Sequence, residues 1–169
     1  MTGEERRLRP EHHVVHDYAN LRSSGLLITD PEWNRRLGEL APVNSHVWHQ
    51  FYTNCRKMYE FFRYHPHEKY LRAEDFLTGP LPFTFKHWTW DVQHFMEGHQ
   101  LHVGGDRTAN TFVLTGSDDK LYLEEFKGAW EAFLGNLKPE HKEIFRDEIE
   151  TRLDSEYRHC GTLSKEFIL

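Results

Sequence analysis

The chain has 169 residues, a formal charge of −6 at pH 7 and 14% aromatic residues. This length and composition are typical of one folded domain with a substantial core. The acidic balance excludes a general electrostatic attraction to nucleic acid and leaves only a local basic patch for that purpose. No stretch approaches about 18 consecutive apolar residues, and the first residues are charged, so we expect no membrane span and no signal peptide. The expected location is the cytoplasm.

Helical spacing of apolar residues dominates the first part of the chain. A stripe over about 11–23 predicts a helix that stops at Gly25. The run Asp30-Pro31-Glu32 predicts the start of a second helix, because Asp caps, Pro suits the first position and Glu complements the dipole. The strongest pattern runs from about Pro42 to Tyr64. This helix is expected in the middle of the molecule.

Turn-forming residues interrupt the pattern after this helix. They predict a long connection at about 65–82, with a short turn of helix from Tyr70 to Leu77. A second strong apolar stripe predicts a helix from about Thr84 to Val103. We expect the molecule to be organised around this helix and the one that precedes the connection.

The remaining elements are one extended segment and two helices. Residues 111–115 are β-branched and aromatic and predict a short extended segment. Residues 116–119 predict a turn that leads into a helix with apolar residues from Leu123 to Leu137. Pro139 suits the first position of the last helix.

These elements predict an all-α fold with one domain over residues 1–169, built as a bundle of five or six helices. Residues 1–10 and 160–169 are expected to be flexible or docked tails. The two cysteines, Cys55 and Cys160, are too few for a disulfide framework. Cys55 falls on an apolar stripe, which predicts a buried free thiol.

Familiar catalytic fingerprints are absent from the sequence, which has no Walker loop, G-x-S-x-G, H-E-x-x-H or C-x-x-C. The 13 histidines therefore carry most of the candidate chemistry. His12, His13 and His16 form the first cluster, in which His12 and His16 lie one helical turn apart and could clamp a metal. No matching carboxylate is evident nearby in the sequence, so a solvent-exposed face is the preferred interpretation.

A second candidate metal site combines histidines from the two strongest helices. His49, or His46, together with His99 and His102, could form a mononuclear three-histidine centre. The central helices contain no Glu-x-x-His, which argues against a di-iron bundle site. The sequence predicts no other cofactor.

An ionic set is the other constellation. Arg56 and Glu60 lie one turn apart beside the apolar stripe of the central helix, and a buried Arg needs a partner. One interpretation is a structural pair that locks neighbouring helices. The other is a catalytic cleft that Arg56 and Glu60 share with His102 and Arg107, because a His flanked by two Arg suits binding or cleavage of a phosphodiester.

Three motifs in order resemble a known family. The run Tyr52–Phe62 (YTNCRKMYEFF) is similar to the H-A-R-N-L-I-D-F-F helix of a family of uncharacterised bacterial all-helical proteins, in which Asn stands at the place of Lys57. A segment like Leu71–Phe76 (LRAEDF) follows in that family. A later helix ends in a His-Leu-Thr-x-x-Arg pattern that His102–Arg107 (HVGGDR) resembles. The agreement covers about residues 43–137.

The layout of that family is similar to HEPN-type bundles, several of which are RNases in toxin–antitoxin or phage-defence systems. Those bundles carry an Arg-x(4–6)-His pattern, a spacing shared by Arg152 with His159 and by Arg7 with His12. The resemblance implies a protein that binds RNA or a nucleotide, with RNA cleavage as one activity.

Three functions stay open from the sequence. The first is HEPN-like RNA or nucleotide binding, in which Arg56 and Arg107 hold phosphate and His102 transfers protons. The second is a non-catalytic regulatory protein whose aromatic-rich helices pair in a homodimer. The third is a metal-dependent bundle enzyme that uses His99 and His102.

Overall fold

The computed structural model describes residues 9–63, 70–96 and 116–160. Within these ranges the chain forms seven helices and no strand, so the predicted all-α fold is confirmed. The helices are α2 (Pro10–Thr29), α3 (Pro31–Gly38), α4 (Ala41–Arg63), α5 (Ala73–Phe76), α6 (Trp90–Met96), α7 (Gly116–Gly135) and α8 (Pro139–Cys160). In this part of the chain, no helix has the length and apolar character needed to cross a membrane.

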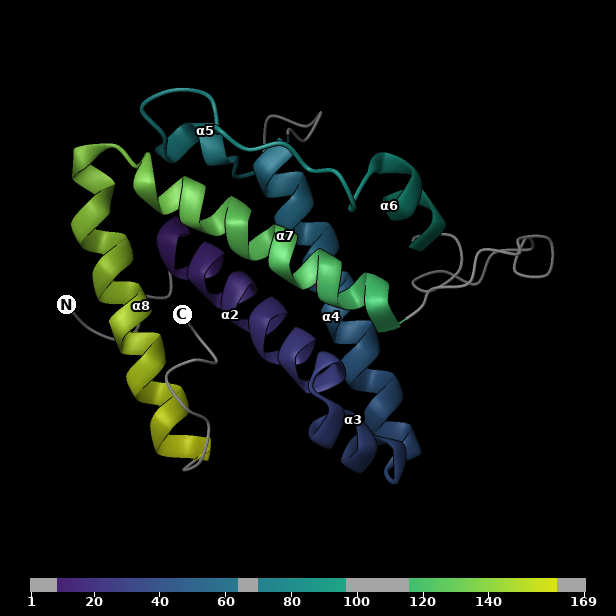
Figure 1. The fold of residues 1–169 in the computed structure, drawn as a ribbon. Coiled ribbons are helices and arrows are strands. Elements are labelled where there is room, and N and C mark those ends of the chain that lie inside the picture. Colours follow the sequence, from purple (N-terminus) through teal and green to yellow (C-terminus); the bar gives the residue numbers. More distant parts are fainter. Residues whose placement is uncertain (1–8, 64–69, 97–115, 161–169) are drawn as a thin grey trace.

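Two long helices, α2 and α4, form the centre of the molecule. Helix α2 contacts α3, α4, α7 and α8, and α4 contacts α2, α3, α5 and α7. Figure 1 shows α2 between α8 and α4, with α7 running along both α2 and α4. The sequence predicted that α4 would share this role with the helix at 84–103, which was wrong, because α2 is the main partner of α4.

Aromatic side chains fill the space between these helices. Phe133 on α7 is fully buried and makes edge contacts with Phe61, Phe76 and Phe145, which come from α4, α5 and α8. Four helices therefore meet at one ring. Large rings supply much buried apolar area per residue and prefer such edge-to-face geometry. The predicted buried thiol of Cys55 lies in the same core and is fully buried.

The prediction that α2 would stop at Gly25 was wrong. The helix continues to Thr29, and Gly25 is buried against α4 and α7. A Cβ atom at this position would lie 2.6 Å from Cδ1 of Leu123 and 2.9 Å from Cε2 of Phe51. Gly25 is therefore a close-approach site inside a helix, where the missing side chain lets Phe51 and Leu123 pack on the α2 backbone.

The predicted start of the helix at 84–103 was also wrong, because α6 begins only at Trp90. The backbone N–H groups of Lys86, His87 and Trp88 donate instead to the carboxylate of Glu125 on α7. A carboxylate that accepts several backbone N–H bonds offers the chain an alternative to helical hydrogen bonding. The part of the predicted helix beyond residue 96 and the extended segment at 111–115 lie outside the described residues.

Other helix boundaries follow the local signals closely. Oδ1 of Asp30 accepts from the backbone N–H groups of Glu32 and Trp33, both at 3.0 Å, so its predicted capping role is confirmed. Pro139 opens α8 as predicted. Residues 116–119, predicted as a turn, instead form the first turn of α7. The predicted tails lie outside the described residues, except that α2 already begins at Pro10 and α8 extends to Cys160.

Gly25→Ala should destabilise the fold. The added methyl group would overlap two buried side chains, a kind of overpacking that costs roughly 1–3 kcal/mol, only partly offset by the better helix propensity of Ala. Urea unfolding should show a lower midpoint with an unchanged slope. Gly38→Ala is the matched control, since nothing lies within 4 Å of its Cβ position. Equal midpoints for the two variants would contradict the close-approach role of Gly25.

Candidate functional site

The predicted pair of Arg56 and Glu60 forms as an ion pair within α4. Nε of Arg56 lies 3.0 Å from Oε1 of Glu60, and the same oxygen accepts from Nε2 of Gln93 at 3.1 Å. Gln93 is buried on α6 and also accepts from the indole of Trp88 at 3.5 Å. The chain of contacts joins α4 to α6, which supports the interpretation of Arg56 and Glu60 as a helix lock.

The other predicted site residues are only partly covered by the structure. His99, His102 and Arg107 lie outside the described residues, so their convergence with Arg56 and the metal site built on them stay predictions. His46 and His49 are exposed on α4. Within the described ranges, no three His, Cys, Asp or Glu side chains are grouped so that they could hold a metal ion.

A polar seam between α2 and α8 brings together residues that the sequence analysis set aside. The two helices run in the same direction. Contacts made later in α2 are therefore made with later residues of α8. Oε1 of Glu11 lies 2.9 Å from Nδ1 of His141. One residue further along α2, His12 pairs with Glu148, and further still Asn20 pairs with Arg152.

Both carboxylates of this seam are buried. Glu11 is 5% exposed and Glu148 is 3% exposed. A carboxylate taken out of water needs a hydrogen-bonding partner to offset its lost hydration. Each one has a histidine at about 3 Å, from the opposite helix. The seam therefore fixes how α8 lies against α2, and it orients the two imidazole rings.

A small cleft opens at the middle of the seam. It has a volume of about 110 Å³ and is lined by His12, Val15, His16, Glu148, Thr151 and Arg152. His12 and His16 are one turn apart on α2, with ring centroids 6.4 Å apart. Arg152 enters from α8, one turn beyond Glu148. A cleft of this size holds a few water molecules or one phosphoryl group.

Hydrogen bonding fixes which nitrogen of His12 carries the hydrogen. Oε2 of Glu148 lies 3.0 Å from Nδ1 of His12. Because a carboxylate only accepts hydrogen bonds, Nδ1 of His12 must be the donor. This arrangement leaves Nε2 to exchange a proton with a ligand. A carboxylate that orients a histidine in this way is a recurring feature of general acid–base sites.

The surroundings of His16 favour its neutral form on balance. Nη2 of Arg152 lies 3.3 Å from Oδ1 of Asn20, and since Arg only donates, the amide nitrogen of Asn20 faces His16. That nitrogen lies 3.0 Å from Nδ1 and 3.4 Å from Nε2 of His16, so it can donate to the ring nitrogen that carries no hydrogen. Burial first, and the Arg152 charge second, lower the pKa of His16 below its usual 6.5, although the nearby Asp17 carboxylate acts in the opposite direction.

Sequence reasoning missed this site because its two halves are far apart in the chain. Glu148 lies 136 residues from His12, so no local search for a carboxylate could find it. One signal was available, since His12 and His16 on one helix and Glu148 and Arg152 on another share the i, i+4 spacing that places side chains on one face.

A buried Tyr–Asp pair lies away from the cleft, in the core between α4 and α7. The hydroxyl of Tyr52 donates to Oδ1 of Asp119 at 2.5 Å, and Asp119 is 1% exposed. Its Oδ2 atom is buried without a hydrogen-bond partner among the described residues. Burial raises the pKa of Asp119 from 3.8 to about 6, although the Tyr52 hydrogen bond acts in the opposite direction. Burial also raises the pKa of the Cys55 thiol, which keeps it unreactive.

Comparison with known proteins adds no relative, since no family model, no curated protein and no solved structure matches this chain. The resemblance to the bacterial all-helical family and to HEPN bundles therefore stays a prediction.

Asp119→Asn should stabilise the protein at neutral pH. The folded state favours protonated Asp119. The stabilising contribution of this group to the free energy of unfolding is therefore complete below pH 3.8 and is lost as the pH rises through about 6. Asparagine keeps the acceptor for Tyr52 and carries no charge. The difference in the free energy of unfolding between the variant and wild type should be up to about 3 kcal/mol more favourable to the variant at pH 7.5 than at pH 4. The measurement is urea unfolding at both pH values.

Asp91→Asn is the matched control for this measurement, because Asp91 is exposed on α6. Its difference from wild type should be the same at both pH values. If Asp119→Asn behaves like Asp91→Asn, the ionised form of Asp119 is not penalised by the fold.

Proposed function

We propose that this protein binds RNA and cleaves it in the cleft between α2 and α8. The observation that carries the proposal is the convergence of His12, its buried partner Glu148, His16 and the cation Arg152 on a space the size of a phosphoryl group. A proton acceptor beside a fixed positive charge is the minimum that phosphodiester cleavage by a neighbouring hydroxyl requires. This agrees with the HEPN-like function that the sequence predicts, at a different set of residues.

The chemistry assigns a role to each side chain. Arg152 binds the non-bridging phosphate oxygens and stabilises the charge that develops on them. Nε2 of His12 takes the proton from the ribose 2′-hydroxyl as its oxygen bonds to phosphorus. The bond from phosphorus to the 5′-oxygen then breaks, and the imidazolium of His12 returns its proton to that oxygen. The products are a 2′,3′-cyclic phosphate and a 5′-hydroxyl.

The remaining residues hold the reacting groups in place. Glu148 keeps the ring of His12 in the required tautomer and stabilises the imidazolium that forms. In its neutral form, His16 donates its one ring N–H to a phosphate oxygen without adding a second charge beside Arg152. Asn20 fixes both His16 and Arg152 through one amide group.

RNA cleavage should be observed in EDTA, because this mechanism needs no metal ion. A labelled single-stranded RNA incubated with the purified chain should yield ends with 2′,3′-cyclic phosphate, whereas the matching DNA should stay intact for lack of the 2′-hydroxyl. His12→Ala should slow cleavage roughly 100-fold or more, and Arg152→Ala and Glu148→Gln should also slow it. His87→Ala, which changes an exposed histidine that belongs to none of the candidate sites, is the control and should leave the rate unchanged.

The same assay distinguishes the alternatives left open by the sequence. If Arg56→Ala, His102→Ala or Arg107→Ala abolishes cleavage and His12→Ala does not, the predicted α4 site is correct and the cleft is structural. Cleavage that EDTA abolishes would favour the metal-dependent enzyme. A chain that leaves RNA intact and scatters light as a dimer would support the non-catalytic homodimer.

A further inference from the structure

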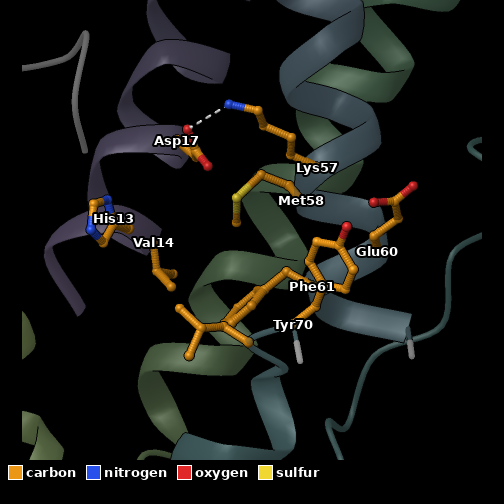
Figure 2. Close-up of a pocket in the computed structure, with 9 residues that line it drawn as sticks. His13, Val14, Asp17, Lys57, Met58, Glu60, Phe61 and Tyr70 are labelled. Atoms are coloured by element: carbon orange, nitrogen blue, oxygen red, sulfur yellow. Dashed lines mark hydrogen bonds and ion pairs between the residues drawn. The ribbon is translucent and has the colours of Figure 1, made fainter. Parts of the chain in front are cut away.

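A second cavity lies on the other side of α2, between α2 and α4 (Figure 2). Its volume of about 430 Å³ is within the usual range for small-molecule sites. The apolar part of its wall is formed by Val14, Met58, Phe61 and Leu71. The polar part is formed by His13, Asp17, Lys57, Glu60 and Tyr70.

The charges around this cavity are compensated within the protein. Oδ1 of Asp17 lies 3.1 Å from Nζ of Lys57, and Figure 2 shows this ion pair joining α2 to α4 at one end of the set of lining residues. Glu60 is paired with Arg56. A cavity with paired charges has little attraction for a strongly charged ligand. It suits an uncharged ligand that has an apolar body and several hydrogen-bonding groups.

The wall offers both of these kinds of contact. Carboxylate oxygens of Asp17 and Glu60 can accept hydrogen bonds, and the Lys57 ammonium and the Tyr70 hydroxyl can donate them. Tyr70 and Leu71 line the cavity and are 57% and 41% exposed in total, so a flat ring could cover part of their surface. A planar heteroaromatic ring with donors and acceptors along its edge meets all of these requirements.

The cavity and the cleft share the same two turns of α2. His12 and His16 face the cleft, whereas His13 and Asp17, each one residue further along, line the cavity. Successive residues of a helix are rotated by about 100°, so the cleft and the cavity lie on two neighbouring faces of α2. Between them lies a solvent-exposed ridge of α2, on which His13 and His16 are exposed. One strand that crosses this ridge could place a phosphate in the cleft and a base in the cavity.

We propose that the cavity between α2 and α4 binds an unstacked nucleobase, so that the substrate is single-stranded RNA. This proposal rests on the cleavage function assigned to the cleft. A base inside a duplex is stacked and paired and cannot enter such a cavity, whereas bases of single strands are commonly bound by stacking on side chains and by hydrogen bonds to their edges. The cavity then selects the strand, and the cleft acts on its phosphate.

Binding of adenosine, guanosine, cytidine and uridine to the full chain tests the cavity directly, with ribose as the negative probe. Titration calorimetry should show binding of at least one nucleoside and none of ribose. Leu71→Asp and Tyr70→Ala should weaken that binding roughly tenfold or more. Leu121→Asp is the matched control, since Leu121 is 45% exposed on α7 and does not line the cavity. Equal affinities for Leu71→Asp and Leu121→Asp, or no nucleoside bound, would overturn the proposal.

The cleavage function and the cavity can fail separately. His12→Ala should bind the nucleoside as wild type does, because His12 lies outside the cavity. Nucleoside binding that is lost in Leu71→Asp, in a chain that cleaves no RNA, would retain the base site and remove the cleft function. Cleavage whose rate and base preference are the same in Leu71→Asp as in wild type would retain the cleft and remove the base site.

Discussion

The packing of α2 around Gly25 is the constraint on which the rest of the structure depends. Phe51 and Leu123 reach the backbone of α2 because residue 25 has no side chain, and this close approach fixes the rotation of α2 about its axis. Once one face of a helix is fixed, its other faces follow from the 100° step between residues. His12 must then point to α8, and Asp17 must point to α4.

The polar seam between α2 and α8 follows from that rotation, and it has a cost that the fold must offset. Glu11 and Glu148 would be expensive to bury alone. Hydrogen bonds from their histidine partners offset the lost hydration of these carboxylates. These bonds form only when α8 lies at one register against α2. An apolar seam would pack the same helices without this restriction, and replacing buried ionic groups by apolar ones is often stabilising. The cost is understandable if the oriented ring of His12 is itself needed, which is what the cleavage mechanism requires.

The sequence predicted those features that depend on neighbours along the chain. The apolar stripe of α4, the Asp30 cap and the start of α8 at Pro139 are all set by residues within a few positions of one another. Two predictions failed where a distant residue decides the outcome. Gly25 can stop a helix or admit a close neighbour, and only Phe51 and Leu123 decide between the two. The Glu125 carboxylate keeps residues 86–88 out of a helix from 37 to 39 positions away. The partners of His12 lie on the last helix, so the candidate site could not be assembled from local spacing.

The acidic charge of the whole chain bears on how an RNA substrate would be held. Phosphate contacts from many Lys and Arg supply most of the affinity of ordinary nucleic-acid-binding proteins, and a chain with a formal charge of −6 cannot rely on them. Among the residues that the structure describes, Arg152 is the one Lys or Arg that lines the proposed cleft, so most of the remaining binding energy would come from contacts that do not depend on charge. Base stacking and edge hydrogen bonds in the cavity beside Asp17 are contacts of that kind. Under the two proposals, the cleft would position the scissile bond and the cavity would supply the affinity that an acidic chain cannot draw from its overall charge.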